Sequence, residues 1–268
     1  NGAIQLVPIL IQHAKDITVI NSYIHSSAAS VPAINGAIYM MNASYCNIRN
    51  NTISQSSGKT PIQIVSSSYN NMTDNKIYSK ASNVIFIGMG FNTYSVAGIS
   101  EFNIFKNNII NGTTGISSAG CYAIKLQGNS KQNKLVGQNT FIGNVISNAF
   151  VGVNAVADVG EVVIINNTFV NIKTGIDVST NVVGGGIVVK GNSINVSNIG
   201  ISLKKGYGII ENNTINAKMP SLAIDYDKIT YAAITYSAAV FIDNSDDVKV
   251  LNNRVTNSYT SFSGMFDT

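Results

Sequence analysis

Asp225 and Asp227 are the acidic residues best placed to act as a pair. They occur in the segment Leu222-Ala-Ile-Asp-Tyr-Asp227, whose alternating pattern predicts a β-strand. Side chains two residues apart in a strand share a face and lie about 6–7 Å from each other. Two carboxylates at that distance favour protonation of one of them, and such a pair can act as general acid and base on a glycosidic bond. The alternative is an ordinary solvated pair on the wet face of a strand.

Asp177 is a third candidate carboxylate. In Ile176-Asp-Val178 the two apolar side chains are expected to face a core, which places Asp177 on the outer side of the strand. Two repeat steps separate it from the strand of Asp225 and Asp227, or about 9–10 Å at roughly 4.8 Å per step. That is close to the separation of about 6.5–9.5 Å found in inverting glycosidases. We therefore predict Asp177, Asp225 and Asp227 as catalytic residues, with a solvated strand face as the alternative for Asp177 too.

The residues predicted to bind substrate are Tyr207, Tyr226, Tyr231 and Lys204. The chain has no Trp, so Tyr is the residue expected to offer a flat apolar face to a sugar ring. Lys204 is the base that sequence reasoning places near the acidic residues, as a β-eliminating lyase would need. Residues 219–237 could instead form one more coil of the fold, with its tyrosines covering the sheet.

Composition excludes several classes of function. Charged residues make up 11% of the chain, and its net charge of +4 is thinly scattered, so no nucleic-acid partner is expected. The apolar runs of three to five residues are far shorter than the roughly 20 needed to span a bilayer, so no membrane insertion is expected. Cys46 and Cys121 are predicted to be buried free thiols. Neither a metal site nor a cofactor is predicted, and the turn around Asp243, Asp246 and Asp247 lacks the ligand spacing of a calcium loop.

A recurring Asn-centred phrase dominates the rest of the sequence. Its nine occurrences are separated by 21 to 40 residues, which is the signature of a solenoid. The anchors are Asn21, Asn51, Asn75, Asn108, Asn139, Asn167, Asn192, Asn213 and Asn253.

One coil is clearest between residues 161 and 191. Val162–Ile165 is a β-branched strand, Asn166-Asn167 a tight turn, Thr168–Val170 a second strand and Ile176–Val178 a third. Such strands are expected to pair in parallel with their equivalents one coil away. Asn suits the corner because it tolerates a left-handed backbone and its amide can bond to identical amides above and below. The apolar residues expected to stack inside this corner are Ile53, Ile77, Ile109, Phe141, Phe169, Ile194, Ile215 and Val255.

Over roughly residues 17 to 260 these strand, Asn-Asn, strand and Gly-Ile-x-Val phrases resemble the right-handed parallel β-helix of the pectin-lyase-like superfamily. The resemblance implies an all-β fold, a right-handed parallel β-helix of about nine coils. We expect residues 1–268 to form one such domain, as a piece of a longer chain. The richness in Asn, Gly, Ser and Thr most resembles the central domain of a bacteriophage tailspike.

A tailspike resemblance implies a homotrimer on the virion tail that hydrolyses a bacterial surface polysaccharide, a capsule or an O-antigen. Two other functions stay open. One is a fibre or adhesin segment that binds polysaccharide without cleaving it, and the other is a polysaccharide lyase. If the chain is bacterial, a secreted or cell-surface location is expected. Which polysaccharide is bound, and whether the site lies within or between subunits, cannot be read from the sequence.

Overall fold

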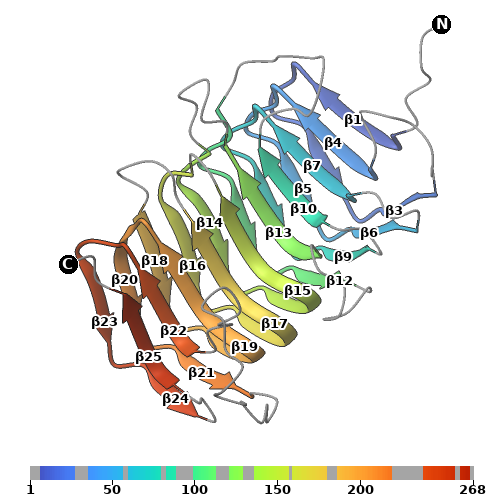
Figure 1. Cartoon of the computed structure of the whole chain (residues 1–268). Helices are drawn as coiled ribbons and strands as arrows, with labels where there is room; N and C mark the ends of the chain where they lie inside the picture. The colour runs from blue at the N-terminus through green and yellow to red at the C-terminus, as the bar shows by residue number, and fades with distance from the viewer. Residues whose placement is uncertain are drawn as a thin grey trace, which may run out of the picture.

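The computed structural model describes residues 7–27, 36–56, 60–79, 83–88, 99–112, 121–128, 136–156, 159–179, 186–218 and 238–256, and the backbone of 260–265. These residues form a solenoid of stacked β-strands, and every strand pair is parallel (Figure 1). The predicted right-handed parallel β-helix is confirmed. None of the described residues lies in a helix that is long and apolar enough to cross a membrane.

One side of the solenoid is a nine-stranded sheet that takes one strand from each coil. Its strands are β2 (Thr18–Ile20), β5 (Asn47–Arg49), β8 (Asn71–Thr73), β11 (Ile104–Lys106), β14 (Asn139–Ile142), β16 (Val162–Ile165), β18 (Gly186–Lys190), β20 (Tyr207–Glu211) and β23 (Val248–Leu251).

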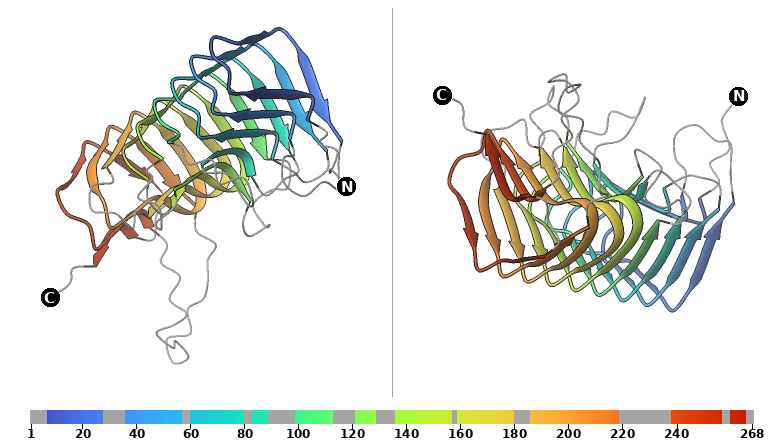
Figure 2. Two further views of the ribbon diagram at one scale, coloured as in Figure 1. Left: turned by 90° about the horizontal axis from the view of Figure 1, so that it is seen from above. Right: turned by 60° about the horizontal axis from the view of Figure 1, so that its bottom comes forward.

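The second sheet has 16 strands and covers the two remaining sides. On one side lie β1 (Ile9–Gln12), β4 (Ile38–Met41), β7 (Ile62–Val65), β10 (Asn83–Gly88), β13 (Tyr122–Gln127), β22 (Ala238–Asp243) and β25 (Thr260–Met265). On the other lie β3 (Tyr23–Ser26), β6 (Thr52–Gln55), β9 (Lys76–Ser79), β12 (Ile109–Gly112), β21 (Thr214–Ala217) and β24 (Arg254–Thr256). Three long strands, β15 (Val145–Val156), β17 (Thr168–Ser179) and β19 (Ser193–Lys204), curve through both sides (Figure 2).

Three glycines of the long strands lie one above another in successive coils. They are Gly152 on β15, Gly175 on β17 and Gly200 on β19. A Cβ atom on Gly175 would lie 2.5 Å from the carbonyl oxygen of Gly200 and 2.8 Å from Cγ2 of Ile194. Only a residue without a side chain therefore fits between the coils at this point.

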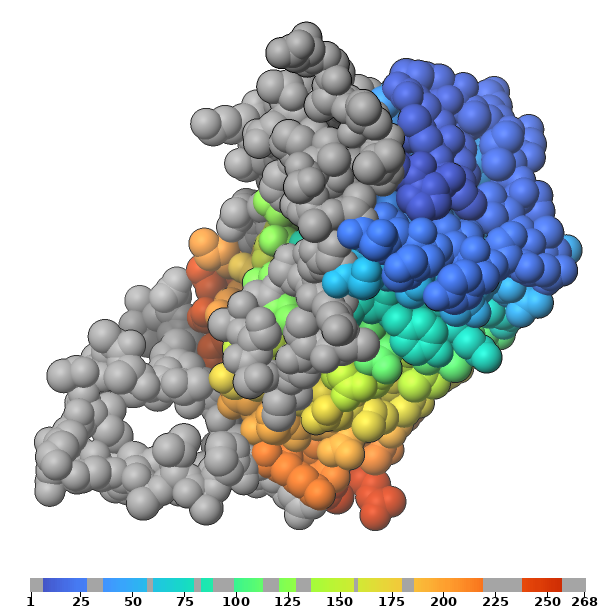
Figure 3. All heavy atoms as spheres, turned by 90° about the vertical axis from the view of Figure 1, so that its right-hand side faces the viewer, coloured from blue at the N-terminus to red at the C-terminus, as the bar shows by residue number. Residues whose placement is uncertain are grey.

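The core is one column of apolar side chains that runs through all coils, which lie against one another in sequence order (Figure 3). Phe105 and Phe141 stack inside it with ring centroids 5.0 Å apart. Cys46 and Cys121 are buried and free, as predicted. No coil could bury its apolar side chains alone, so the stability of each depends on its neighbours.

A ladder of buried amides lines the corner that follows the nine-stranded sheet. In each step the Nδ2 and the backbone N–H of one Asn donate to Oδ1 of the next; for Asn192 and Asn213 both distances are 2.9 Å. The ladder members are Asn51, Asn75, Asn108, Asn144, Asn167, Asn192, Asn213 and Asn253. The predicted corner ladder is thus present, with two differences in membership.

Asn139 and Asn21 were assigned to this ladder wrongly. Asn139 accepts a 3.0 Å hydrogen bond from Asn103 in a second ladder, at the corner that precedes the nine-stranded sheet. The phrase Asn-x-apolar occurs twice in that coil, and Asn144 is the residue that belongs to the ladder at the corner after the nine-stranded sheet. In the first coil Ser22 holds the ladder position and donates its N–H to Asn51 Oδ1, while Asn21 lies outside it.

The assignment of Ile109 to the interior was also wrong. The inward side chain is the second residue after each ladder Asn, so Ile110 is buried and Ile109 is exposed. Phe141 is buried as predicted, but in β14 of the nine-stranded sheet.

Candidate functional site

Asp177 lies on the outer side of β17, as its alternation with apolar neighbours predicted. Ile176 and Val178 are fully buried in the core, whereas Asp177 is partly exposed. The position follows directly from the two-residue period of a strand.

Parallel pairing extends this position into a row of outward residues along the solenoid axis. Lys125 on β13, Asn154 on β15, Asp177 on β17 and Ser202 on β19 are consecutive partners in register. Phe241 on β22 continues the row. We call these five residues the Asp177 row.

Asn154 positions the carboxylate of Asp177. Its Nδ2 donates a 3.2 Å hydrogen bond to Asp177 Oδ2. Asn154 and Ser202 are nearly inaccessible although they point away from the core, with exposures of 3% and 2%. Asp177 therefore has a buried polar residue on each neighbouring strand, and the hydrogen bond from Asn154 restricts how its carboxylate can orient.

Lys125 is a base that sequence reasoning missed. It lies two register steps from Asp177, or about 9–10 Å between backbones. Burial lowers the pKa of its ammonium, because desolvation disfavours the charged form. Its Nζ lies 5.0 Å from the centroid of the Tyr122 ring. A lysine of lowered pKa is neutral more often than an exposed one, and so is better able to accept a proton.

Lys204 lies beside the Asp177 row, two residues after Ser202 on the same face of β19. Its Nζ is 5.6 Å from the centroid of Phe241, and it pairs in register with Ser179 and Asp243. The structure thus brings Lys204 and Asp177 to one face, as expected.

A buried amide oxygen on this face has no donor. Gln127 follows Lys125 by two residues on β13, and no hydrogen bond reaches its Oε1 in the part of the chain that the structure describes. A buried acceptor without a partner costs free energy, so water or a bound hydroxyl group would be favoured there.

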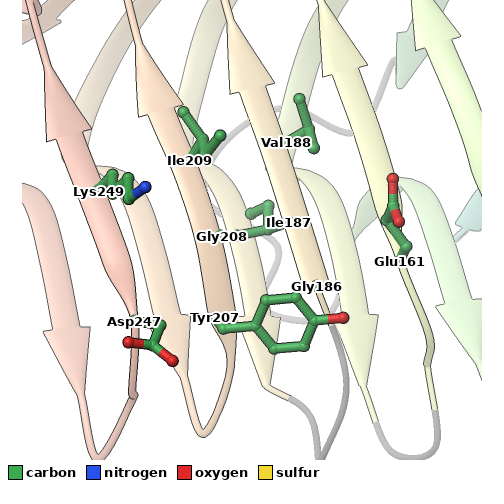
Figure 4. A pocket seen from close by; sticks show the side chains of 9 residues that line it. All are labelled: Glu161, Gly186, Ile187, Val188, Tyr207, Gly208, Ile209, Asp247 and Lys249. Atoms are coloured by element: carbon green, nitrogen blue, oxygen red, sulfur yellow. The ribbon is translucent and has the colours of Figure 1, made fainter.

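Tyr207 lies on a different face. It belongs to β20 of the nine-stranded sheet, and Lys205, with a φ of 56°, turns the chain between Lys204 and Tyr207. The Tyr207 ring borders a hollow of about 360 Å³ on the outer side of that sheet (Figure 4). The hollow has an apolar floor that includes Val188 and Ile209.

Three charged residues border this hollow: Glu161, Asp247 and Lys249. The sequence analysis predicted no catalytic or substrate-binding role for either carboxylate. No sequence signal could have joined them, because 86 positions separate them in the chain. Parallel stacking alone brings them to one surface.

The remaining predicted site residues, Asp225, Asp227, Tyr226 and Tyr231, lie outside the described residues. Within those residues, no group of three or more His, Cys, Asp or Glu side chains is arranged to hold a metal ion.

No family model and no curated protein matches this chain. Among solved structures, it is similar to PfbA, a surface adhesin of Streptococcus pneumoniae, with a TM-score of 0.64 and 15% identity over 96% of this chain. It is also similar to an alginate lyase from Paenibacillus sp. str. FPU-7, with a TM-score of 0.61 and 12% identity. The aligned part covers 97% of this chain and 99% of the lyase, but the chain spans only 62% of the adhesin. At such identities the likeness shows a shared fold, the parallel β-helix.

Proposed function

We propose that the protein binds a bacterial surface polysaccharide along the Asp177 row and cleaves it. The observation that carries the proposal is the register that aligns Lys125, Asn154, Asp177 and Ser202 on one outer face. Lys125 and Asp177, the partly exposed polar members of the row, lie two steps apart, or about 9–10 Å along the axis. A polymer of sugar rings that lies parallel to the axis would meet one of these charged groups at every second step. The fold shared with an adhesin and an alginate lyase supports a polysaccharide as the ligand.

Hydrolysis is the proposed reaction. Asp177 and one carboxyl group from Asp225 or Asp227 would flank the scissile bond, one protonating the glycosidic oxygen and the other activating water. The hydrogen bond from Asn154 Nδ2 orients the Asp177 carboxyl group, as a residue that must face the scissile bond requires. Tyr226, Tyr231 and Lys204 would contact the flanking sugars.

A β-elimination is the second candidate reaction, and the lowered pKa of Lys125 favours it. Its neutral amine would take the C5 proton of a uronate residue, the C4–C5 double bond would form, and the C4–O bond would break. The leaving oxygen would take its proton from water. The rate would rise as pH rises towards the lowered pKa of Lys125, because the neutral fraction of the amine increases.

The test uses purified capsular polysaccharide and alginate with assays for two products. Hydrolysis yields new reducing ends alone, whereas elimination also yields the ultraviolet absorbance of an unsaturated uronate. Asp177→Asn and the double variant Asp225→Asn/Asp227→Asn are each expected to slow hydrolysis by about 100-fold or more. Asp246→Asn, an exposed carboxylate off the row, is the matched control. Unchanged cleavage by the Asp177 variant would exclude it as a catalytic residue.

Lys125→Met separates the two reactions. It is expected to abolish elimination and to leave hydrolysis within a few-fold. Binding with no new reducing ends, unaltered by any of these variants, would instead identify a non-catalytic adhesin or fibre.

The proposal extends to the assembly. We place the chain in a homotrimeric bacteriophage tailspike on the virion tail, or on a cell surface or in the secreted fraction if it is bacterial. The support is the Asn-, Gly- and Thr-rich solenoid itself. Light scattering should give three times the chain mass of 28.4 kDa. A monomer at working concentrations would contradict the trimer.

A further inference from the structure

The corner that precedes the nine-stranded sheet carries exposed aromatic rings. Four aromatic residues hold the same position relative to their strands, each two residues before a position that pairs in register with the neighbouring coil, so they share one edge of that sheet. They are Tyr45 before β5, Tyr69 before β8, Phe102 before β11 and Tyr207 at the start of β20. All four are more than a third exposed. They differ in what lies against the faces of their rings.

Tyr45, Tyr69 and Phe102 stack on one another. The ring centroids of Tyr45 and Tyr69 are 5.2 Å apart with an interplanar angle of 8°, and those of Tyr69 and Phe102 are 4.9 Å apart at 12°. Both faces of Tyr69 are therefore occupied, and only ring edges remain open to a ligand.

Tyr207 lies on a glycine in place of another ring. Its partner in register is Gly186, and a Cβ on that glycine would lie 3.0 Å from Cε2, 3.1 Å from Cζ and 3.2 Å from Oη of Tyr207. Figure 4 shows the ring extended from β20 across Gly186, towards the side where Glu161 lies. One face of the ring packs on the sheet, and the opposite face is open to solvent.

The polar groups of the hollow stand at its ends. Glu161 precedes β16 on one side of the Tyr207 ring, and Asp247 precedes β23 on the other (Figure 4). Lys249 is the third charged residue. Two carboxylates against one ammonium give the hollow an excess of negative charge, which disfavours an anionic ligand.

We propose that the Tyr207 hollow binds one ring of a neutral sugar, at a site separate from the Asp177 row. The apolar face of a hexose would stack on the open face of Tyr207, and its hydroxyl groups would donate to Glu161 and Asp247. A uronate would be repelled by the same carboxylates. The choice of a saccharide rests on the proposed function, whereas the site does not depend on cleavage at the Asp177 row.

The experiment is a titration of protein labelled with ¹³C in its tyrosine rings, with neutral glucan, mannan and galactan hexasaccharides and with an alginate hexasaccharide as the acidic probe. The signal that is missing from Tyr207→Phe identifies Tyr207. The proposal predicts a saturable shift of this signal with at least one neutral hexasaccharide and none with alginate. The Tyr69 signal should stay unchanged.

Substitutions sharpen the result. Tyr207→Ala is expected to weaken binding of the neutral probe about five- to tenfold, the loss of one aromatic contact. Tyr69→Ala is the matched control, because the exposure of Tyr69 (44%) is close to that of Tyr207 (43%), while the faces of its ring are already occupied. Tyr207→Phe should retain binding. Gly186→Ala, which lifts the ring from the sheet, should fall between the wild type and Tyr207→Ala.

Three outcomes would overturn the site: no shift of the Tyr207 signal with any neutral probe, a shift with alginate alone, or equal losses in Tyr207→Ala and Tyr69→Ala. Asp177→Asn distinguishes this proposal from the proposed function. It should leave the Tyr207 titration unchanged whether or not it abolishes cleavage, and Tyr207→Ala should leave the bond-breaking rate on saturating substrate unchanged.

Discussion

The two corners that bound the nine-stranded sheet use the same left-handed backbone with different side chains. At the corner after the sheet, every left-handed position is Asn, Asp or Gly. These are Asn21, Asn50, Asp74, Asn107, Gly143, Asn166, Gly191, Asn212 and Asn252. At the corner before the sheet, the same conformation is held by more varied residues. These are Asp16, Tyr45, Tyr69, Phe102, Gln138 and Asp247, with φ values of 58°, 58°, 62°, 55°, 53° and 49°.

At the corner after the sheet, the fold determines which residues occupy the left-handed position. At the corner before the sheet, the residue type at that position is free to vary. Asn, Asp and Gly adopt positive φ at the lowest steric cost, and the amide that follows them is buried in the ladder. An aromatic residue with positive φ is an outlier whose cost must be offset. Here ring stacking offers the compensation, and the side chains are exposed. The corner before the sheet therefore displays a surface, although Asn70, Asn103 and Asn139 still form a short buried ladder inside it.

The largest expected effect is at the ladder. Asn167→Ala removes the acceptor of the Asn144 side chain and backbone N–H, and the donor to the carbonyl oxygen of Phe141. Several buried polar groups lose their partners, so the free energy of unfolding should fall by about 3 kcal/mol or more. Circular dichroism during denaturant unfolding measures it. Asn195→Ala, at an exposed position of β19, is the control and should change little.

The next effect tests the left-handed position itself. Asn166 has a φ of 54°, and Asn166→Val should destabilise the protein by about 1–2 kcal/mol, since a β-branched residue is disfavoured there. Asn166→Gly should be nearly neutral. Equal melting temperatures for the Val and Gly variants would show that the backbone conformation is not what selects Asn.

A smaller effect on stability is expected at the corner before the nine-stranded sheet. Tyr69→Asn relieves the left-handed strain but loses stacking with Tyr45 and Phe102, so the two contributions nearly cancel and the change should stay within about 1 kcal/mol. Thermal unfolding measures it. A loss as large as that of Asn167→Ala would mean that this corner, too, is determined by the fold.

The smallest effect concerns how stability depends on pH. This dependence should differ between variants of the uncharged Asn ladder and a variant of Lys125, which is a partly buried cation. The ladder variants should shift stability equally at every pH, whereas Lys125→Met should not. The folded pKa of Lys125 lies below its ordinary value of 10.5, so the unfolded chain binds more protons between the two values and stability rises with pH across that window. Below the window the cost of burying the charge is fully present. Lys125→Met should therefore stabilise the protein slightly at neutral pH, and the gain should vanish above pH 10.5, as measured by melts across pH.

Much of the fold followed from local patterns. The Asn phrase predicted stacked coils with an amide corner, and alternation in Ile176-Asp-Val178 placed Asp177 outside, because a strand repeats every two residues whatever its neighbours are. The same reasoning failed where two phrases competed in one coil. Asn139 and Asn144 are equivalent as sequence patterns, and only the hydrogen bonds of the neighbouring coils distinguish them.

Predicting the candidate site required more knowledge of long-range strand register than predicting the fold did. Lys125 is 52 positions from Asp177 in the chain, and their alignment depends on how many residues each intervening turn contains. Tyr207, three residues after Lys204, was grouped with it, yet the left-handed turn at Lys205 directs the two side chains to different faces.

By itself, the sequence determined the type of strand, the inward and outward alternation and the residues that can turn a corner. These properties depend on sterics and hydrogen bonding within a few residues of chain. Only the tertiary structure decided which coils lie in register, and hence that Asn154 meets Asp177 and that Glu161 and Asp247 flank Tyr207. Register is set by the packing of whole coils against one another, a sum of many weak contacts that no local pattern contains.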